Sequence, residues 1–120
     1  MKIINNRKKT TNEKVSIFKT TMPLLESMYE EFKELSKKKP DSPINKNKIK
    51  IANRLLEKIR IVLVDEDSIY FLDVLDEDDL PQASDVTLIF SQYLAAMKAF
   101  RKTYSDWNGL EQAWFTETQK

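Results

Sequence analysis

The stretch INKNKIKIANRLLEKIRIVLV, from Ile44 to Val64, decides the fold. Its apolar residues recur at steps of three and four, the spacing that places them on one face of an α-helix. They are Ile51, Ala52, Leu55, Leu56, Ile59, Val62 and Leu63. The other face is basic and carries Lys48, Lys50, Arg54, Lys58 and Arg60. The pattern predicts a long central helix against which the rest of the chain packs.

A first helix is predicted before this segment, from Thr21 to about Lys38. Thr21 is a suitable N-cap, and Pro23 suits a first turn, where its missing N–H is not needed. The central helix is expected to begin at Ser42-Pro43, a cap residue followed by proline. Because this connection is short, the two helices should be antiparallel.

A third long helix is predicted from about Ser84 to Tyr104. Its apolar stripe has helical spacing and consists of Val86, Ile89, Phe90, Tyr93, Leu94, Met97, Phe100 and Tyr104. Alanines of the same segment would let a neighbouring element approach closely. They are Ala95, Ala96 and Ala99.

Two segments leave alternatives open. Residues 59–75 read either as a β-hairpin, because they are rich in β-branched and aromatic residues, or as a bend followed by a short helix over about 67–77. We prefer the bend and short helix, because a lone hairpin in a helical chain is marginal. After the Asn108-Gly109 break, the end of the chain is either a short helix or a docked tail.

The fold class is therefore predicted to be all-α, a small antiparallel bundle of three long helices plus short helices. Residues 1–14 are polar and basic and are expected to form a flexible arm, with residues 15–120 as a single helical domain. A single glycine and four prolines leave few of the turn residues that a β-sandwich or barrel requires.

The composition excludes several kinds of chemistry. Cysteine and histidine are absent, so the chain has no disulfides, no ordinary zinc site and no Ser-His or Cys-His nucleophile pair. With one glycine there is no phosphate-binding loop. No apolar run approaches the roughly 20 residues that span a bilayer. We expect a cytoplasmic, non-enzymatic protein without cofactor and without membrane association.

The charge of the chain is divided between its halves. Residues 1–62 carry sixteen Lys/Arg and seven Asp/Glu, a net charge of +9, whereas residues 63–120 carry four and twelve, a net charge of −8. Such asymmetry marks a surface for a charged partner, or the two halves neutralise each other in one bundle or between subunits. We favour neutralisation, because charged helix faces are usually only solvated.

Acidic residues form one candidate for metal-dependent chemistry. They are Asp65, Asp67, Asp73, Asp76 and Asp78. Carboxylate oxygens suit Mg²⁺ or Ca²⁺, and a Mg²⁺-dependent enzyme is a third hypothesis. The loop starting at Asp76 fails the EF-hand pattern, because Leu80, Pro81 and Thr87 occupy positions that need an acidic ligand, a glycine and a glutamate. A solubilising loop is the preferred interpretation.

A basic cluster supports nucleic-acid binding as the alternative function. It comprises Lys37, Lys38, Lys39, Lys46, Lys48 and Lys50, and Arg7, Lys8 and Lys9 on the arm could add phosphate contacts. The cluster lacks interleaved aromatic residues, so it predicts weak, sequence-tolerant binding.

The leading hypothesis is a non-catalytic interaction protein, an adaptor that binds another protein or itself through charge-polarised faces and an aromatic C-terminal segment. The predicted partner-binding residues are Tyr104, Trp107, Leu110 and Trp114. Aromatic anchors of this kind are enriched in interfaces. The preferred alternative is that they fold back and complete the core, because large aromatics on a small domain are usually buried.

Overall fold

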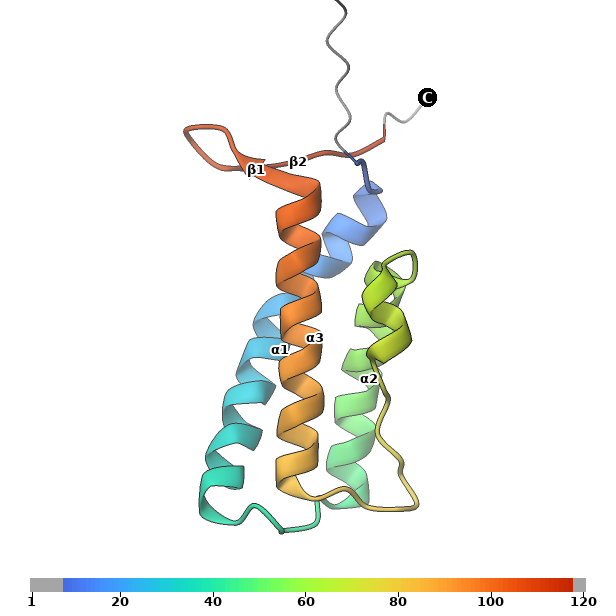
Figure 1. Ribbon diagram of the computed structural model, residues 1–120, viewed down its shortest axis with the longest axis vertical. Helices are drawn as coiled ribbons and strands as arrows, with labels where there is room; N and C mark the ends of the chain where they lie inside the picture. Colours follow the sequence, from blue (N-terminus) through green and yellow to red (C-terminus); the bar gives the residue numbers. More distant parts are fainter. Residues whose placement is uncertain (1–7, 118–120) are drawn as a thin grey trace, which may run out of the picture.

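The computed structural model describes residues 8–117 and shows a mostly helical chain with a small hairpin at one end (Figure 1). The elements are α1 (Asn12–Lys38), α2 (Lys46–Leu63), the 3₁₀ helix η1 (Asp67–Phe71), α3 (Ala83–Tyr104), β1 (Ser105–Trp107) and β2 (Gln112–Trp114). The three long helices pack around a continuous apolar core. The expectation of a mostly helical chain is confirmed.

Helix α1 begins nine residues earlier than predicted. Thr11 is its N-cap, and the Thr11 hydroxyl accepts a hydrogen bond from the backbone N–H of Lys14 at 3.2 Å. The expected start at Thr21 is wrong, because the buried stripe begins at Val15 and continues without a break past Pro23. Of the predicted arm, residues 1–7 lie outside the described residues, and residues 12–14 form the first turn of α1.

Helix α2 has the buried face that the sequence predicts, with one exception. Ile51, which was expected in that face, is 40% exposed. The helix also begins later than expected, because Asn45 rather than Ser42 caps it. Pro43 instead pairs with Gln82 in an isolated antiparallel bridge, so the segment before α2 is used to hold the start of α3.

Residues 59–75 form neither a hairpin nor a helix to residue 77. Helix α2 continues to Leu63, and η1 confirms a short helical turn at residues 67–71. Residues 72–82 then form an extended segment, here called the strap. Arg60 donates from Nη1 to the Leu72 carbonyl at 2.6 Å, and the Tyr93 hydroxyl donates to the Asp73 carbonyl at 2.9 Å. The strap is therefore fixed to both α2 and α3.

The strap determines the direction of α3. It runs back along the bundle, so α2 and α3 start at the same end and lie parallel, while α1 is antiparallel to both (Figure 1). Backbone bonds confirm that the two starts are adjacent: Ile44 N–H donates to Pro81 at 2.9 Å, and Ala83 N–H donates to Ser42 at 2.8 Å. The bundle is thus not antiparallel throughout.

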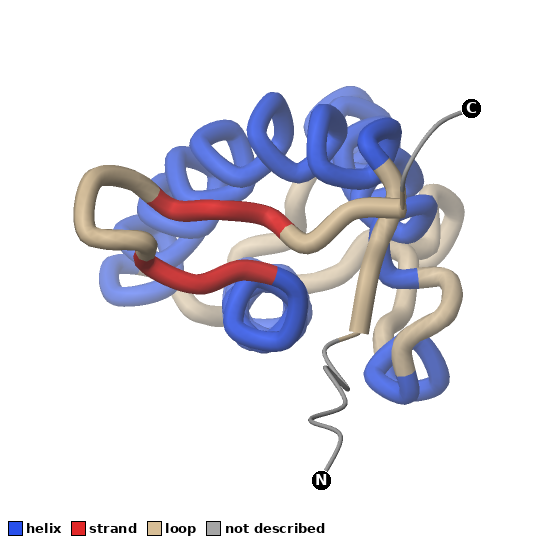
Figure 2. The backbone as a smooth tube through the Cα atoms, turned by 90° about the horizontal axis from the view of Figure 1, so that it is seen from above, coloured by secondary structure: helices blue, strands red, loops and turns tan. Residues whose placement is uncertain are grey.

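The end of the chain is a β-hairpin that lies across one end of the bundle (Figure 2). Its turn needs Gly109, whose φ of +99° is a conformation that residues with a Cβ rarely adopt. Asn108 supports the turn by accepting from the backbone N–H groups of Leu110 and Glu111, both at 2.9 Å. Of the two alternatives for the end of the chain, the docked tail therefore describes the structure better than the short helix does. The strand pairing was not predicted.

Across the residues that the structure describes, no helix combines the length and the apolar character needed to cross a membrane.

Candidate protein-binding surfaces

The structure separates the four predicted partner-binding residues into two pairs. Tyr104 is buried, and Trp114 packs inward with its ring centroid 5.0 Å from that of Phe18. Trp107 and Leu110 lie on the hairpin, where Leu110 is 87% exposed. Tyr104 is part of the core and the partly buried Trp114 packs against it, as the alternative interpretation expected, whereas Trp107 and Leu110 are the exposed pair.

Tyr104 has a second structural contact at this end of the bundle. Its hydroxyl donates a hydrogen bond to Oε2 of Glu66 at 2.8 Å. Burial, reinforced by the hydrogen bond and negative charge of Glu66, raises the pKa of Tyr104 to about 12. The side chain therefore joins the end of α3 to the turn that follows α2.

The predicted basic cluster lies at the opposite end of the bundle from Lys8 and Lys9. All six lysines are exposed, at the end of α1 and the start of α2. Helix α1 alone has 27 residues, so it separates Lys9 from this cluster by about 40 Å. Lys8 and Lys9 therefore do not form one continuous basic surface with the cluster, and Arg7 lies outside the described residues.

Acidic residues of the second half contact lysines of the first half at both ends of the bundle. Lys14 Nζ lies 2.7 Å from Oδ2 of Asp65, and Lys46 Nζ lies 3.8 Å from Oδ1 of Asp78. Within the basic cluster, Lys37 also pairs with Glu34 at 3.3 Å. The two halves thus partly neutralise each other, which lowers the positive potential of the cluster.

The acidic residues do not converge on a metal site in the part of the chain that the structure describes. Asp76 has a local role instead: its Oδ1 accepts from the backbone N–H groups of Asp78 at 2.8 Å and Asp79 at 3.2 Å. These bonds lower the pKa of Asp76, because they stabilise its charged form. This geometry is that of a turn within the strap.

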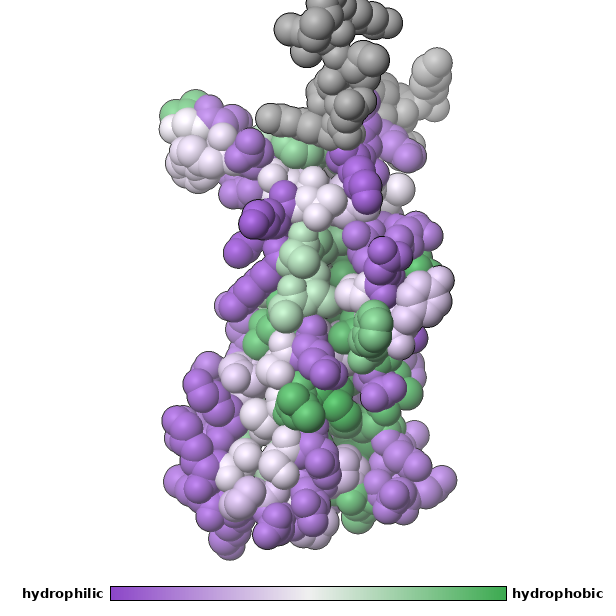
Figure 3. Space-filling model, viewed as in Figure 1, coloured by the Kyte–Doolittle hydropathy of each residue, from purple (hydrophilic) through white to green (hydrophobic). Residues whose placement is uncertain are grey.

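One apolar surface lies on the outer side of α3, and we call it the α3 face. Phe71 is 75% exposed and Leu88 is 60% exposed. A groove of about 340 Å³ lies between η1 and α3. It is lined by Ser68, Phe71, Leu72, Gln92, Ala95, Ala96 and Ala99. Figure 3 shows hydrophobic residues gathered along the middle of this side of the molecule.

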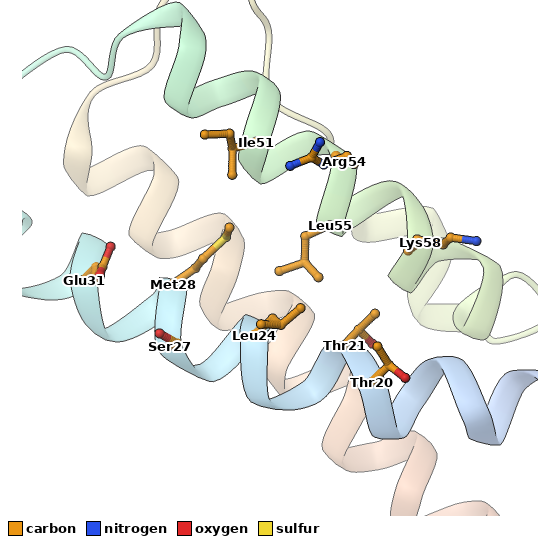
Figure 4. A pocket seen from close by; sticks show the side chains of 10 residues that line it. All are labelled: Thr20, Thr21, Leu24, Ser27, Met28, Glu31, Ile51, Arg54, Leu55 and Lys58. Carbon is orange, nitrogen blue, oxygen red and sulfur yellow. The ribbon is translucent and has the colours of Figure 1, made fainter.

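A second apolar surface is the groove between α1 and α2, which we call the α1–α2 groove. Leu24, Met28, Ile51 and Leu55 lie between the two helices, with α3 behind them (Figure 4). Leu24 is 52% exposed. The groove has a volume of about 450 Å³. Its remaining lining is polar and consists of Thr20, Thr21, Ser27, Glu31, Arg54 and Lys58.

The sequence predicted that Ala95, Ala96 and Ala99 would let a neighbouring element approach closely. Only Ala96 is buried, and Ala95 and Ala99 are exposed in the α3 face. Sequence reasoning missed Leu24 and Leu88. The signal for both was available, since each is an apolar residue that falls outside the core-facing stripe of its own helix.

Comparison of the chain with protein-family models, curated proteins and solved structures finds no match.

Proposed function

We propose that this chain is a non-catalytic interaction protein that binds an amphipathic helix of a partner protein on the α3 face. The observation that carries the proposal is the exposure of Phe71 and Leu88 beside a groove with an alanine floor. Large apolar side chains that stay in water on one face mark binding sites more often than scattered ones do. Ala95 and Ala99 would allow a partner backbone to approach closely.

Charge at the groove defines the chemistry of the partner. Asp67 directly precedes Ser68, and Asp73 directly follows Leu72, two residues that line the groove. Both aspartates are exposed. A partner helix with an apolar stripe and basic residues along the edge that faces η1 would complement this arrangement. Trp107 and Leu110 of the hairpin stay predicted as additional partner contacts.

Protein binding has more support than the nucleic-acid alternative. Two of the six clustered lysines, Lys37 and Lys46, already have acidic neighbours, and Lys8 and Lys9 lie at the other end of α1. A phosphate-binding surface needs several free cations along one path. The α3 face, in contrast, has its exposed apolar residues, Phe71 and Leu88, on the same side of the molecule as the groove.

Two peptides test the proposal by NMR titration. Each is roughly 18 residues long, about five helical turns, with the same leucine stripe; one carries lysines on its polar face and the other glutamates. We expect the lysine peptide to shift the backbone amides of η1 and of residues 88–99, with weaker binding of the glutamate peptide. Equal binding of both peptides, or shifts confined to another surface, would contradict the proposal.

Two exposed leucines provide a matched pair of variants for the same titration. Leu88→Asp should lower the affinity for the lysine peptide at least about tenfold, because it places a carboxylate in the apolar contact. Leu24→Asp makes the same change in the α1–α2 groove and should leave the affinity unchanged. An affinity that depends on Leu24 rather than Leu88 would place the binding site in the α1–α2 groove and would contradict the proposal.

A further inference from the structure

We infer that the α1–α2 groove binds the same groove of a second copy of this chain, so that two α1–α2 pairs form a symmetric four-helix interface. This groove shares no lining residue with the α3 face, so the inference is independent of the proposed function. Its starting point is the position of the strap. The strap lies along α2 and α3, whereas Leu24 and Ile51 remain exposed between α1 and α2.

The two walls of the groove carry opposite charge. The α1 wall contributes Glu31, and the α2 wall contributes Arg54 and Lys58. An adjoining hollow, which shares Met28, Glu31 and Ile51 with the groove, extends it to Lys48. Glu30 extends the acidic surface on α1, while Glu34 beside it pairs with Lys37. None of Glu31, Lys48, Arg54 and Lys58 has an ion-pair partner within residues 8–117. These charges are therefore available to groups that approach from outside.

A second copy places opposite charges against both walls of the groove if the two-fold axis of the dimer runs parallel to the helices. This axis places α1 of each copy over α2 of the other, and it keeps residues of the same height opposite each other. Glu31 and Lys48 line the same section of the groove, so Glu31 of each copy then faces Lys48 of the other. Thr20 lies at the level of Lys58, at the other end of the groove (Figure 4).

Charge disfavours the other symmetric arrangement. A two-fold axis across the helices would place α2 over α2, which brings Lys48, Arg54 and Lys58 of one copy onto the same cations of the other. Like charges that meet in an interface are destabilising and suppress such a pairing. The structure therefore selects a single dimer geometry.

The selected geometry also suits helix packing. Helix α1 is antiparallel to α2 in each chain, so every neighbouring pair in the four-helix interface is antiparallel (Figure 1). Leu24, Met28, Ile51 and Leu55 of the two copies would lie at its centre, with the charged walls at the edges. An apolar centre with a polar rim is the usual organisation of a protein interface.

Charge reversal tests this geometry directly by sedimentation equilibrium of the full chain. Glu31→Lys alone should raise the dimer dissociation constant at least about tenfold, because each interface then has two lysine–lysine contacts. Lys48→Glu alone should do the same through glutamate–glutamate contacts. An equimolar mixture of the two variants should recover the affinity of the parent chain within about threefold, since both contacts become attractive in the heterodimer.

Matched variants outside the groove serve as controls. Glu26→Lys and Lys50→Glu change exposed residues of the same two helices and should leave the dimer unchanged, and Leu24→Asp should dissociate it. Circular dichroism verifies that every variant keeps its helix content. A parent chain that stays monomeric at roughly 100 μM, folded single variants whose mixture does not associate, or a dimer that dissociates with Leu88→Asp rather than Leu24→Asp would each overturn the inference.

Discussion

At the scale of single residues, Tyr104 shows how a polar group is accommodated in the core. Its ring packs against Phe100, with 4.7 Å between the centroids, while its hydroxyl reaches Glu66. A hydrogen bond to a charged group contributes about 1.5–3 kcal/mol when the donor is buried. The helical spacing of α3 predicted that Tyr104 is buried, but it could not identify Glu66, which lies 38 residues away in sequence.

Tyr104→Phe should lower the free energy of unfolding by about 1.5–3 kcal/mol at neutral pH, because it removes this bond and leaves the ring in place. The pKa of Tyr104 is about 12 in the folded chain and near 10 when unfolded. Between these values the unfolded state loses its proton first, so folding stability falls as pH rises from about 10 to about 12. Urea unfolding across this range should show a smaller alkaline loss for the variant.

Tyr70→Phe is the control for this experiment, since Tyr70 is exposed and has no hydrogen bond within the described residues. It should change neither the stability at neutral pH nor the alkaline slope. An alkaline loss as large in Tyr104→Phe as in the parent chain would show that another group causes it.

At the scale of elements, the strap is the segment whose conformation could not be predicted from the sequence. Helical periodicity predicted the ends of α3 to within one residue, because its apolar stripe is packed against the core along its whole length. The strap has no such pattern. Besides the bonds from Arg60 and Tyr93, it is held by Asn53, which donates to the Leu75 carbonyl at 2.7 Å and accepts from the Leu75 N–H at 2.8 Å. A contact that crosses 22 residues is not encoded in local spacing.

Asn53→Ala should destabilise the chain by about 2 kcal/mol, because both backbone groups of Leu75 lose their partner at a partly buried position. Chemical denaturation measures the loss, and hydrogen exchange should show faster exchange at the Leu75 amide. Asn47→Ala changes an exposed asparagine of the same helix and should stay within about 0.5 kcal/mol of the parent. Unchanged protection of Leu75 in Asn53→Ala would contradict this role of the side chain.

At the scale of the whole molecule, the two ends of the described chain close one end of the bundle together. Thr10 N–H donates to the Phe115 carbonyl at 2.8 Å, and Glu117 N–H donates to the Thr10 carbonyl at 2.9 Å. Beneath this bridge, Trp114 lies on Phe18 of α1 and Phe100 of α3. The sequence predicted that aromatic residues would cover an open end, but the pairing of Thr10 with Thr116 depends on where α1 begins.

Trp114 and Trp107 provide a comparison within one hairpin that tests this closure. Trp114→Ala should cost about 3 kcal/mol of unfolding free energy, because it removes a large ring from contact with two core aromatics. Trp107→Ala removes the same side chain from an exposed position and should stay within about 0.5 kcal/mol. Trp114→Ala should also speed hydrogen exchange at the Thr10 amide. The Trp114 ring supports the segment whose Phe115 carbonyl accepts the hydrogen bond from this amide. If both variants cost the same, or if the Thr10 amide stays protected without the ring, the hairpin is held by its turn alone and the two chain ends do not close the bundle as a unit.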